Sequence, residues 1–161
     1  MKTTPFAIGV AVMVLTSWFA SPAQAITSNP EMQTRVETVL EQNPGGTQIA
    51  WNEVSWDDGE VVLTLAPPTV GAGPAVLAVV GGCTSGKFCA YNQTGYLGDK
   101  ITYSTCTSTQ SVANLIGAVR SIANSRTTGT IRAYAGSTLL ASAAAGAGSN
   151  VTGTSTNISC S

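Results

Sequence analysis

The sequence contains no histidine, and only 9% of its 161 residues are charged. Without histidine the chain lacks the base of a Ser-His or Cys-His catalytic pair. It also lacks a common zinc ligand, and no Cys-x-x-Cys pair offers a thiolate site in its place. These absences disfavour both an enzyme and a zinc site, and no metal or other cofactor is expected.

The apolar stretch near the start, residues 6–20, is too short to span a membrane, because a spanning helix needs roughly 20 apolar residues. It follows a positive start and precedes the small-x-small pattern Ala23-Gln24-Ala25, as in a cleaved signal peptide. No cysteine follows the cleavage site to take a lipid. We expect residues 1–25 to be removed, leaving a secreted, extracellular protein that starts at Ile26 and has no membrane partner. A retained membrane anchor is the alternative.

The cysteines lie in the second half of the sequence, at Cys83, Cys89, Cys106 and Cys160. An even number of cysteines in an exported chain indicates disulfides. Spacing alone permits three connectivities for two bridges.

Charge is divided unevenly along the chain. Residues 26–80 hold one base, Arg35, and seven acids: Glu31, Glu37, Glu41, Glu53, Asp57, Asp58 and Glu60. Residues 81–161 hold one acid, Asp99, and five bases: Lys87, Lys100, Arg120, Arg126 and Arg132. Opposite charges favour docking of the two parts on each other. The basic part is too sparsely charged to indicate nucleic acid as a partner.

The first part of the mature chain reads as a helix followed by a β-hairpin. Asn29 is a cap residue before Pro30, and an apolar face at helical spacing comprises Met32, Val36, Val39 and Leu40. Asp58-Gly59 is a favoured hairpin turn, with the return strand at residues 61–65. The apolar alternation before this turn slips at Asn52-Glu53, which predicts a bulge.

The acids of that turn are Asp57, Asp58 and Glu60. They are compatible with calcium binding, but no ligand spacing follows them, so solvated turn residues are favoured.

Composition divides the chain into a signal peptide, an N-terminal module at residues 26–66, a linker or tether at 67–80 and a disulfide-bonded domain at 81–161. The module is too small to bury much core alone. It therefore either packs on the disulfide-bonded domain or is a removable pro-segment.

Residues 81–161 contain short β-prone runs with Gly-rich turns, which favour a small all-β sandwich. The runs lie at 87–91, 99–103, 119–124, 130–135 and 138–143, with two weaker ones near 150–160. Disorder is the alternative for residues 141–159 by their composition, although Cys160 argues against it.

Two patches in this domain carry a family resemblance. The first is Cys83-x-x-Gly86-x-x-Cys89-x-Tyr91, continuing as Tyr91-x4-Tyr96-x-Gly98. The second is "VRSIANSRTTGTIRAY", residues 119–134, with Ser121, Asn124 and Tyr134. Together they resemble a βγ-crystallin-type Greek-key motif and, more closely, the actinobacterial peptidase inhibitor family I36, the Streptomyces metalloproteinase inhibitor type.

The resemblance implies a βγ-crystallin-like double Greek-key β-sandwich for this domain. With the short helix and β-hairpin predicted before it, we expect an α+β chain overall. The same resemblance implies the bridges Cys83–Cys89 and Cys106–Cys160, with Tyr91 and Tyr96 packed where the first hairpin bends. Gly98 would take a backbone conformation that a side chain forbids. The calcium signature of such domains requires Asn or Asp where this chain has Ile116 and Gly117, so a tight calcium site is not expected.

The resemblance also implies a function: inhibition of an extracellular peptidase, of a thermolysin-like metallopeptidase above all, by a rigid substrate-like loop. The matching segment is Ser137, Thr138, Leu139, Leu140 and Ala141, with the two leucines as the apolar residues for the peptidase. The family tethers this segment with a second local disulfide, whereas this chain has no cysteine between 107 and 159. Strand residues packed in the core are the alternative for the two leucines.

A second class of function stays open. It is a non-inhibitory extracellular βγ-crystallin-like module that is structural, binds a cell-wall, matrix or protein partner, or acts as a killer-toxin-like antimicrobial protein.

Overall fold

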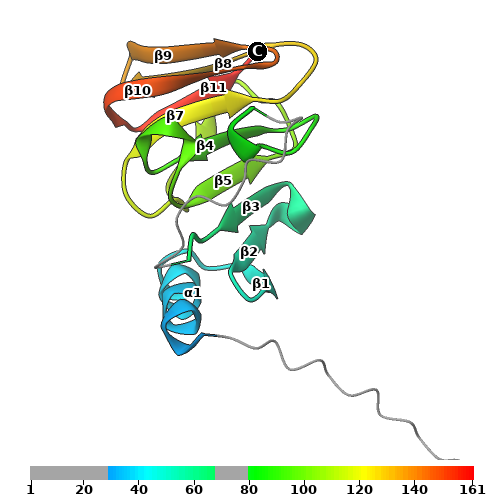
Figure 1. Ribbon diagram of the computed structural model, residues 1–161, viewed down its shortest axis with the longest axis vertical. Coiled ribbons are helices and arrows are strands. Elements are labelled where there is room, and N and C mark those ends of the chain that lie inside the picture. Colours follow the sequence, from blue (N-terminus) through cyan, green and yellow to red (C-terminus); the bar gives the residue numbers. More distant parts are fainter. Residues whose placement is uncertain (1–28, 68–79) are drawn as a thin grey trace, which may run out of the picture.

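The computed structural model describes residues 29–67 and 80–161; the expected signal peptide and most of the linker lie outside these ranges. Two antiparallel sheets and one helix make up the fold (Figure 1). Sheet A has the strand order β1-β2-β3-β5-β4-β7-β10, and sheet B has the order β6-β11-β8-β9. The expected β-rich sandwich with one helix is confirmed.

The helix α1, Pro30–Gln42, begins as its sequence predicts. The Asn29 side chain accepts a hydrogen bond from the backbone N–H of Glu31, at 3.0 Å, and thereby satisfies one of the unpaired N–H groups of the first turn. Three of the four predicted apolar residues, Met32, Val36 and Val39, are fully buried. The helix therefore presents one apolar face to the core.

The strands of sheet A are β1 (Thr47–Ala50), β2 (Glu53–Trp56), β3 (Val61–Thr64), β4 (Phe88–Tyr91), β5 (Lys100–Tyr103), β7 (Val119–Asn124) and β10 (Ala147–Ser155). Those of sheet B are β6 (Gln110–Ser111), β8 (Thr130–Ala135), β9 (Thr138–Ala144) and β11 (Asn157–Cys160). The sequence runs predicted β7 and β8 to the residue. They missed β6, whose two polar residues have no strand pattern.

The expected bulge at Asn52-Glu53 is wrong. The chain reverses there, because residues 51–52 form a turn between β1 and β2, which pair with each other. The slip in the apolar alternation thus marked the end of a strand. Two short strands stand where one bulged strand was expected.

One row of side chains crosses sheet A from strand to strand. The register places Val54, Leu63, Ile101, Ala90 and Ile122 opposite one another in turn, and each is fully buried. We call their side of the sheet the inner face. Because paired residues share a face, this row joins the N-terminal hairpin and the later strands in one core.

Different elements cover the two ends of the inner face. Gln33 of α1 exchanges side-chain hydrogen bonds with Gln48, which pairs with Val54, so α1 lies on the inner face at β1 and β2. Sheet B packs against the β5, β4 and β7 end, as residues such as Ile131 and Ile158 share the core cluster with Ile122. The helix thus occupies the end of sheet A away from sheet B (Figure 1).

The N-terminal hairpin is bonded into the sheet of the later domain, since β3 pairs with β5 over Val61↔Tyr103 to Thr64↔Lys100. Residues 80–161 consist of a first half with β4 to β7 and a second half with β8 to β11, and each half contributes one strand to the other's sheet. β10 pairs with β7 in sheet A, and β6 pairs with β11 in sheet B. These pairings fix the position of the β8–β9 hairpin, where the candidate segment lies.

Candidate functional site

The segment 137–141 lies in the β8–β9 hairpin. Ser137 belongs to the two-residue turn, and Thr138, Leu139, Leu140 and Ala141 lie in β9. Gly136 opens the turn at φ +59° and donates its N–H to Oγ1 of Thr156, at 3.1 Å. The segment is therefore a short turn and a strand, and it does not protrude as a long loop.

β9 is the last strand of sheet B, and no strand of the described residues pairs with its outer edge. The register with β8 is regular from Thr130↔Ala144 to Ala133↔Ala141 and resumes at Tyr134↔Leu139. Leu140 is the extra residue, so it forms a β-bulge. Bulges concentrate at sheet edges and beside functional sites, where they redirect side chains.

The bulge gives the two leucines different environments. Leu139 is 53% exposed, whereas Leu140 packs against the core cluster and the next residue, Ala141, is buried. The core-packing alternative from the sequence thus describes Leu140, and the exposed position belongs to Leu139. A single large apolar side chain stands on the open edge of this hairpin.

Hydrogen bonds from neighbouring segments hold the β8–β9 hairpin in place. Asn124 of β7 is fully buried, and its amide donates to the carbonyl oxygens of Gly129, at 3.1 Å, and Ala143, at 3.4 Å. The carbonyl of Tyr134 accepts from the backbone N–H of Thr156, at 2.8 Å, and from Oγ of Ser155, at 3.1 Å. These bonds fix both strands of the hairpin to neighbouring strands, so its exposed edge rests on a rigid support.

The tyrosine motif forms a second, internal cluster. Tyr91 is 2% exposed, meets the Tyr96 ring edge-to-face at 5.8 Å and donates its hydroxyl to the carbonyl of Gly81, at 2.9 Å. Burial, with Tyr96 nearby as a smaller cause, raises the pKa of Tyr91 above its ordinary value. A tyrosine held neutral and hydrogen-bonded in this way is part of the architecture.

Ser121 closes the bend of that motif. Its buried hydroxyl accepts from the N–H of Tyr96, at 3.0 Å, and donates to the carbonyl of Gln93, at 2.7 Å. Gly98 has φ +76°, and a Cβ there would overlap the amide oxygen of Asn92. The structure therefore brings Tyr91, Tyr96, Gly98 and Ser121 together, as the sequence motif implies.

The structure contains both of the disulfides implied by the resemblance, Cys83–Cys89 and Cys106–Cys160. Cys83 and Cys89 are fully buried in one cluster with Tyr91 and Ala123. Gly86, at φ +77° between them, donates its N–H to the carbonyl of Ser125, at 2.9 Å. The second bridge ties the segment after β5 to the end of β11.

Sequence reasoning missed the contacts of Asp99. Asp99 is buried, and its carboxylate accepts hydrogen bonds from Arg35, from the backbone N–H of Ala66 and from Asn92. The signal in the sequence was charge: Arg35 is the one base of its part and Asp99 the one acid of the other. The contact fastens α1 and the end of the N-terminal hairpin to the later domain.

Neither a metal cluster nor a membrane-spanning helix occurs in the described residues. Residues 29–67 and 80–161 hold no group of three or more His, Cys, Asp or Glu side chains that could bind a metal ion. The same ranges form no helix that is long and apolar enough to cross a membrane.

The later domain matches a known protein family. Residues 79–145 match the family model described as "Peptidase inhibitor family I36". No curated protein and no solved structure matches the chain significantly. The matched range contains the tyrosine motif, Ser121, Asn124 and the whole candidate segment, whereas α1 and β1 to β3 precede it. The match assigns residues 79–145, rather than the whole chain, to peptidase inhibitor family I36.

Proposed function

We propose that this protein is a secreted, non-enzymatic inhibitor of metallopeptidases that acts through residues 137–141. The observation that carries the proposal is Leu139, which stands 53% exposed beside a bulge on the end strand of sheet B, inside the range that matches the inhibitor family. Two disulfides suit an extracellular protein, because such bonds persist in oxidising compartments.

The mechanism follows from backbone geometry. Residues 138–141 are extended and have an outer edge without a strand partner among the described residues, and extended peptides are commonly bound by main-chain hydrogen bonds along a strand. A thermolysin-like zinc peptidase would receive this edge as it receives a substrate, with the Leu139 side chain in its apolar pocket. The bonds through Asn124 and Tyr134 already order the hairpin, so docking loses little conformational entropy.

The exchange of β6 and β10 between the two halves supports a βγ-crystallin-type double Greek key as the scaffold. In that scaffold, the tyrosine motif stabilises the fold, and the β8–β9 hairpin carries the inhibitory segment. The missing local disulfide of the family is replaced in this proposal by the bulge and by Asn124.

The test is a titration of a thermolysin-type and a subtilisin-type peptidase with the oxidised protein. Leu139→Ser is expected to weaken inhibition of the metallopeptidase by about 10- to 100-fold, since a buried leucine contact contributes about 1.5–3 kcal/mol. Leu97→Ser is the matched control, because Leu97 is also an exposed leucine, at 49%, outside the β8–β9 hairpin. It is expected to inhibit like the unaltered protein.

Full activity of both peptidases in excess protein would refute the proposal. The family match would then describe the fold alone, and the non-inhibitory binding, structural or antimicrobial class would take its place. Equal loss in Leu139→Ser and Leu97→Ser would refute the assignment of the segment.

A further inference from the structure

Among the described residues, β1 forms one end of sheet A, and it lies outside the range that matches the inhibitor family. β1 ends sheet A, so its outer backbone groups have no strand partner among the described residues. Ile49 on this strand is 53% exposed, and Trp51 in the following turn is 37% exposed. An unpaired strand edge flanked by exposed apolar side chains is a template for an added strand.

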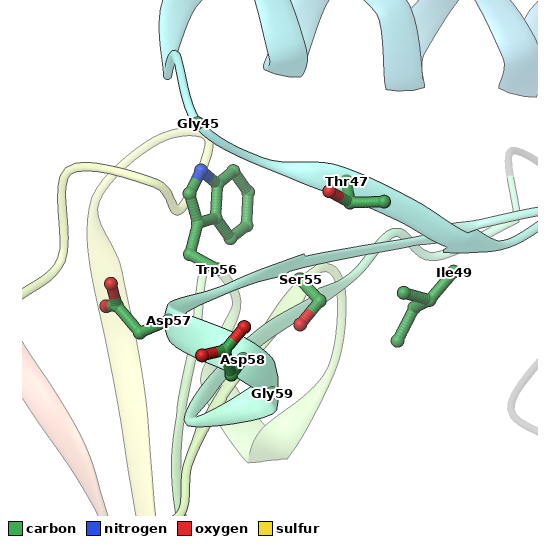
Figure 2. A pocket seen from close by; sticks show the side chains of 8 residues that line it. All are labelled: Gly45, Thr47, Ile49, Ser55, Trp56, Asp57, Asp58 and Gly59. Carbon is green, nitrogen blue, oxygen red and sulfur yellow. The ribbon is translucent and has the colours of Figure 1, made fainter.

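A pocket of about 460 Å³ lies beside this edge (Figure 2). Its lining combines an apolar side chain of β1, a hydroxyl of β2 and the two carboxylates that follow β2. The lining residues are Gly45, Thr47, Ile49, Ser55, Trp56, Asp57, Asp58 and Gly59. Helix α1 lies on the opposite, inner face, because Thr47 pairs with Ser55 and both alternate with the inward Gln48 and Val54.

Ser55 of β2 offers a hydroxyl to this pocket. It is 8% exposed and lines the pocket, yet its hydroxyl makes no hydrogen bond with any of the described residues. The hydroxyl oxygen of Ser55 is open to the pocket, because among the described residues the buried side-chain oxygen without a hydrogen-bond partner is Oγ of Ser125. A side chain of an added strand that reaches across β1 into the pocket would provide a hydrogen-bond partner for this hydroxyl.

Charge indicates the kind of peptide. Residues 29–67 hold seven acids and one base, and that base, Arg35, is paired with Asp99. Asp57 and Asp58 are exposed at the pocket, and within the described ranges neither forms an ion pair. A cationic residue beside the apolar contact at Ile49 would complement this surface. A second copy pairing edge to edge through β1 would instead oppose acidic parts.

We propose that the β1 edge and its pocket bind an extended, basic segment of a partner protein as an eighth strand of sheet A. Its backbone pairs with residues 47–50, an apolar side chain contacts Ile49, and a lysine or arginine meets Asp57 and Asp58. This surface is separate from the β8–β9 hairpin, so it does not depend on the proposed peptidase inhibition.

The test uses a capped octapeptide of alternating valine and lysine as the probe. Added to the oxidised protein at low salt, it is expected to cause saturable amide NMR shifts at residues 47–50 and slower hydrogen exchange there. A valine-glutamate peptide tests the charge, and a valine-lysine peptide with N-methylated backbone tests the strand pairing. Both are expected to bind at least about tenfold more weakly.

Two matched double variants distinguish an effect of the pocket from an effect of net charge. Asp57→Asn with Asp58→Asn is expected to weaken the valine-lysine peptide about tenfold, whereas Glu37→Gln with Glu41→Gln, which removes the same charge from α1, changes binding less than about twofold. Asparagine tolerates the positive φ of both aspartates. Peptidase inhibition is expected to be equal in both variants.

The proposal would be overturned by no saturable shift at millimolar peptide, by equal binding of the three peptides, or by shifts confined to β9. Shifts at residues 47–50 that appear with protein concentration alone, together with a dimer in sedimentation, would also overturn it. They would assign the edge to a second copy of the chain.

Discussion

One guanidinium nitrogen of Arg35 donates to both carboxylate oxygens of Asp99, at 2.8 and 3.0 Å, across 64 residues of sequence. A second nitrogen of Arg35 donates to the carbonyl oxygen of Ala66. The backbone N–H of Ala66 in turn donates to the carboxylate of Asp99, at 2.8 Å. The side chain of Asp99 is 5% exposed and that of Arg35 30%. The one base of residues 26–80 and the one acid of residues 81–161 therefore form the ion pair that joins these two parts of the chain.

Arg35→Ala is expected to destabilise the protein by about 2 kcal/mol, because a buried carboxylate loses its charged partner. The value lies below that of a fully buried pair since Arg35 is partly exposed. Urea unfolding with both disulfides intact measures the change. Arg120→Ala, which removes a guanidinium with one 3.3 Å bond to the carbonyl of Gly153, is the control and is expected to cost less than about 0.5 kcal/mol. Equal losses would contradict the role of the contact.

Gly98→Ala and Gly95→Ala form a matched pair. Both glycines have positive φ, at +76° and +69°, so alanine brings about 1–2 kcal/mol of backbone strain at either site. Only Gly98 also has the Asn92 side chain in the space of the new Cβ, whereas Gly95 faces open space. We expect Gly98→Ala to lower the free energy of unfolding by at least about 1 kcal/mol more than Gly95→Ala. Similar values in thermal unfolding would show that backbone strain alone selects Gly98.

The two disulfides close loops of unequal length, with sequence separations of 54 and 6. Chain entropy predicts about 4 kcal/mol for Cys106–Cys160 and about 2 kcal/mol for Cys83–Cys89. Replacing each pair by alanine in separate variants and comparing their urea midpoints tests this order. A larger loss for the short loop would mean that packing around Tyr91, rather than loop closure, sets the contribution.

Alkaline pH is expected to unfold the protein through its buried tyrosines. Burial raises the pKa of Tyr103 and of Tyr91 above the ordinary 10.0, so the folded state favours the neutral phenols. Their contribution to stability is complete below about pH 10 and is lost progressively above it, as the unfolded chain ionises first. Tyrosinate absorbance should show these two groups ionising together with loss of near-ultraviolet circular dichroism. Ionisation of all four tyrosines in a folded protein at about pH 10 would contradict this.

Local signals predicted much of the secondary structure. Asn29 and Pro30 marked the start of α1, and the β-prone runs at residues 119–124 and 130–135 marked β7 and β8, because capping and strand propensity depend on nearby residues. The pairing of β3 with β5 was not predictable, since strand partners are chosen by packing between distant segments. The division of charge gave only a general indication that the two parts would dock.

The candidate segment shows the same limit. Its position followed from the family resemblance, but the different exposures of Leu139 and Leu140 did not. They depend on a one-residue register shift against Ala133 and Tyr134, and adjacent leucines carry no sequence mark of such a shift. The resemblance predicted a loop; the chain has an edge strand with a bulge.

The exchange of β6 and β10 constrains how the molecule assembles. Neither sheet is complete until β6 pairs with β11, at Gln110 and Ile158, and β7 pairs with β10, at Ser121 and Asn150. The entropy of closing these long loops is therefore lost before the stabilising contacts form. Folding is therefore expected to be slow for a chain of this size. A polypeptide divided in the turn between β7 and β8 would yield two fragments. The first lacks β10 of sheet A and the second lacks β6 of sheet B, so we expect them to regain structure only by complementing each other.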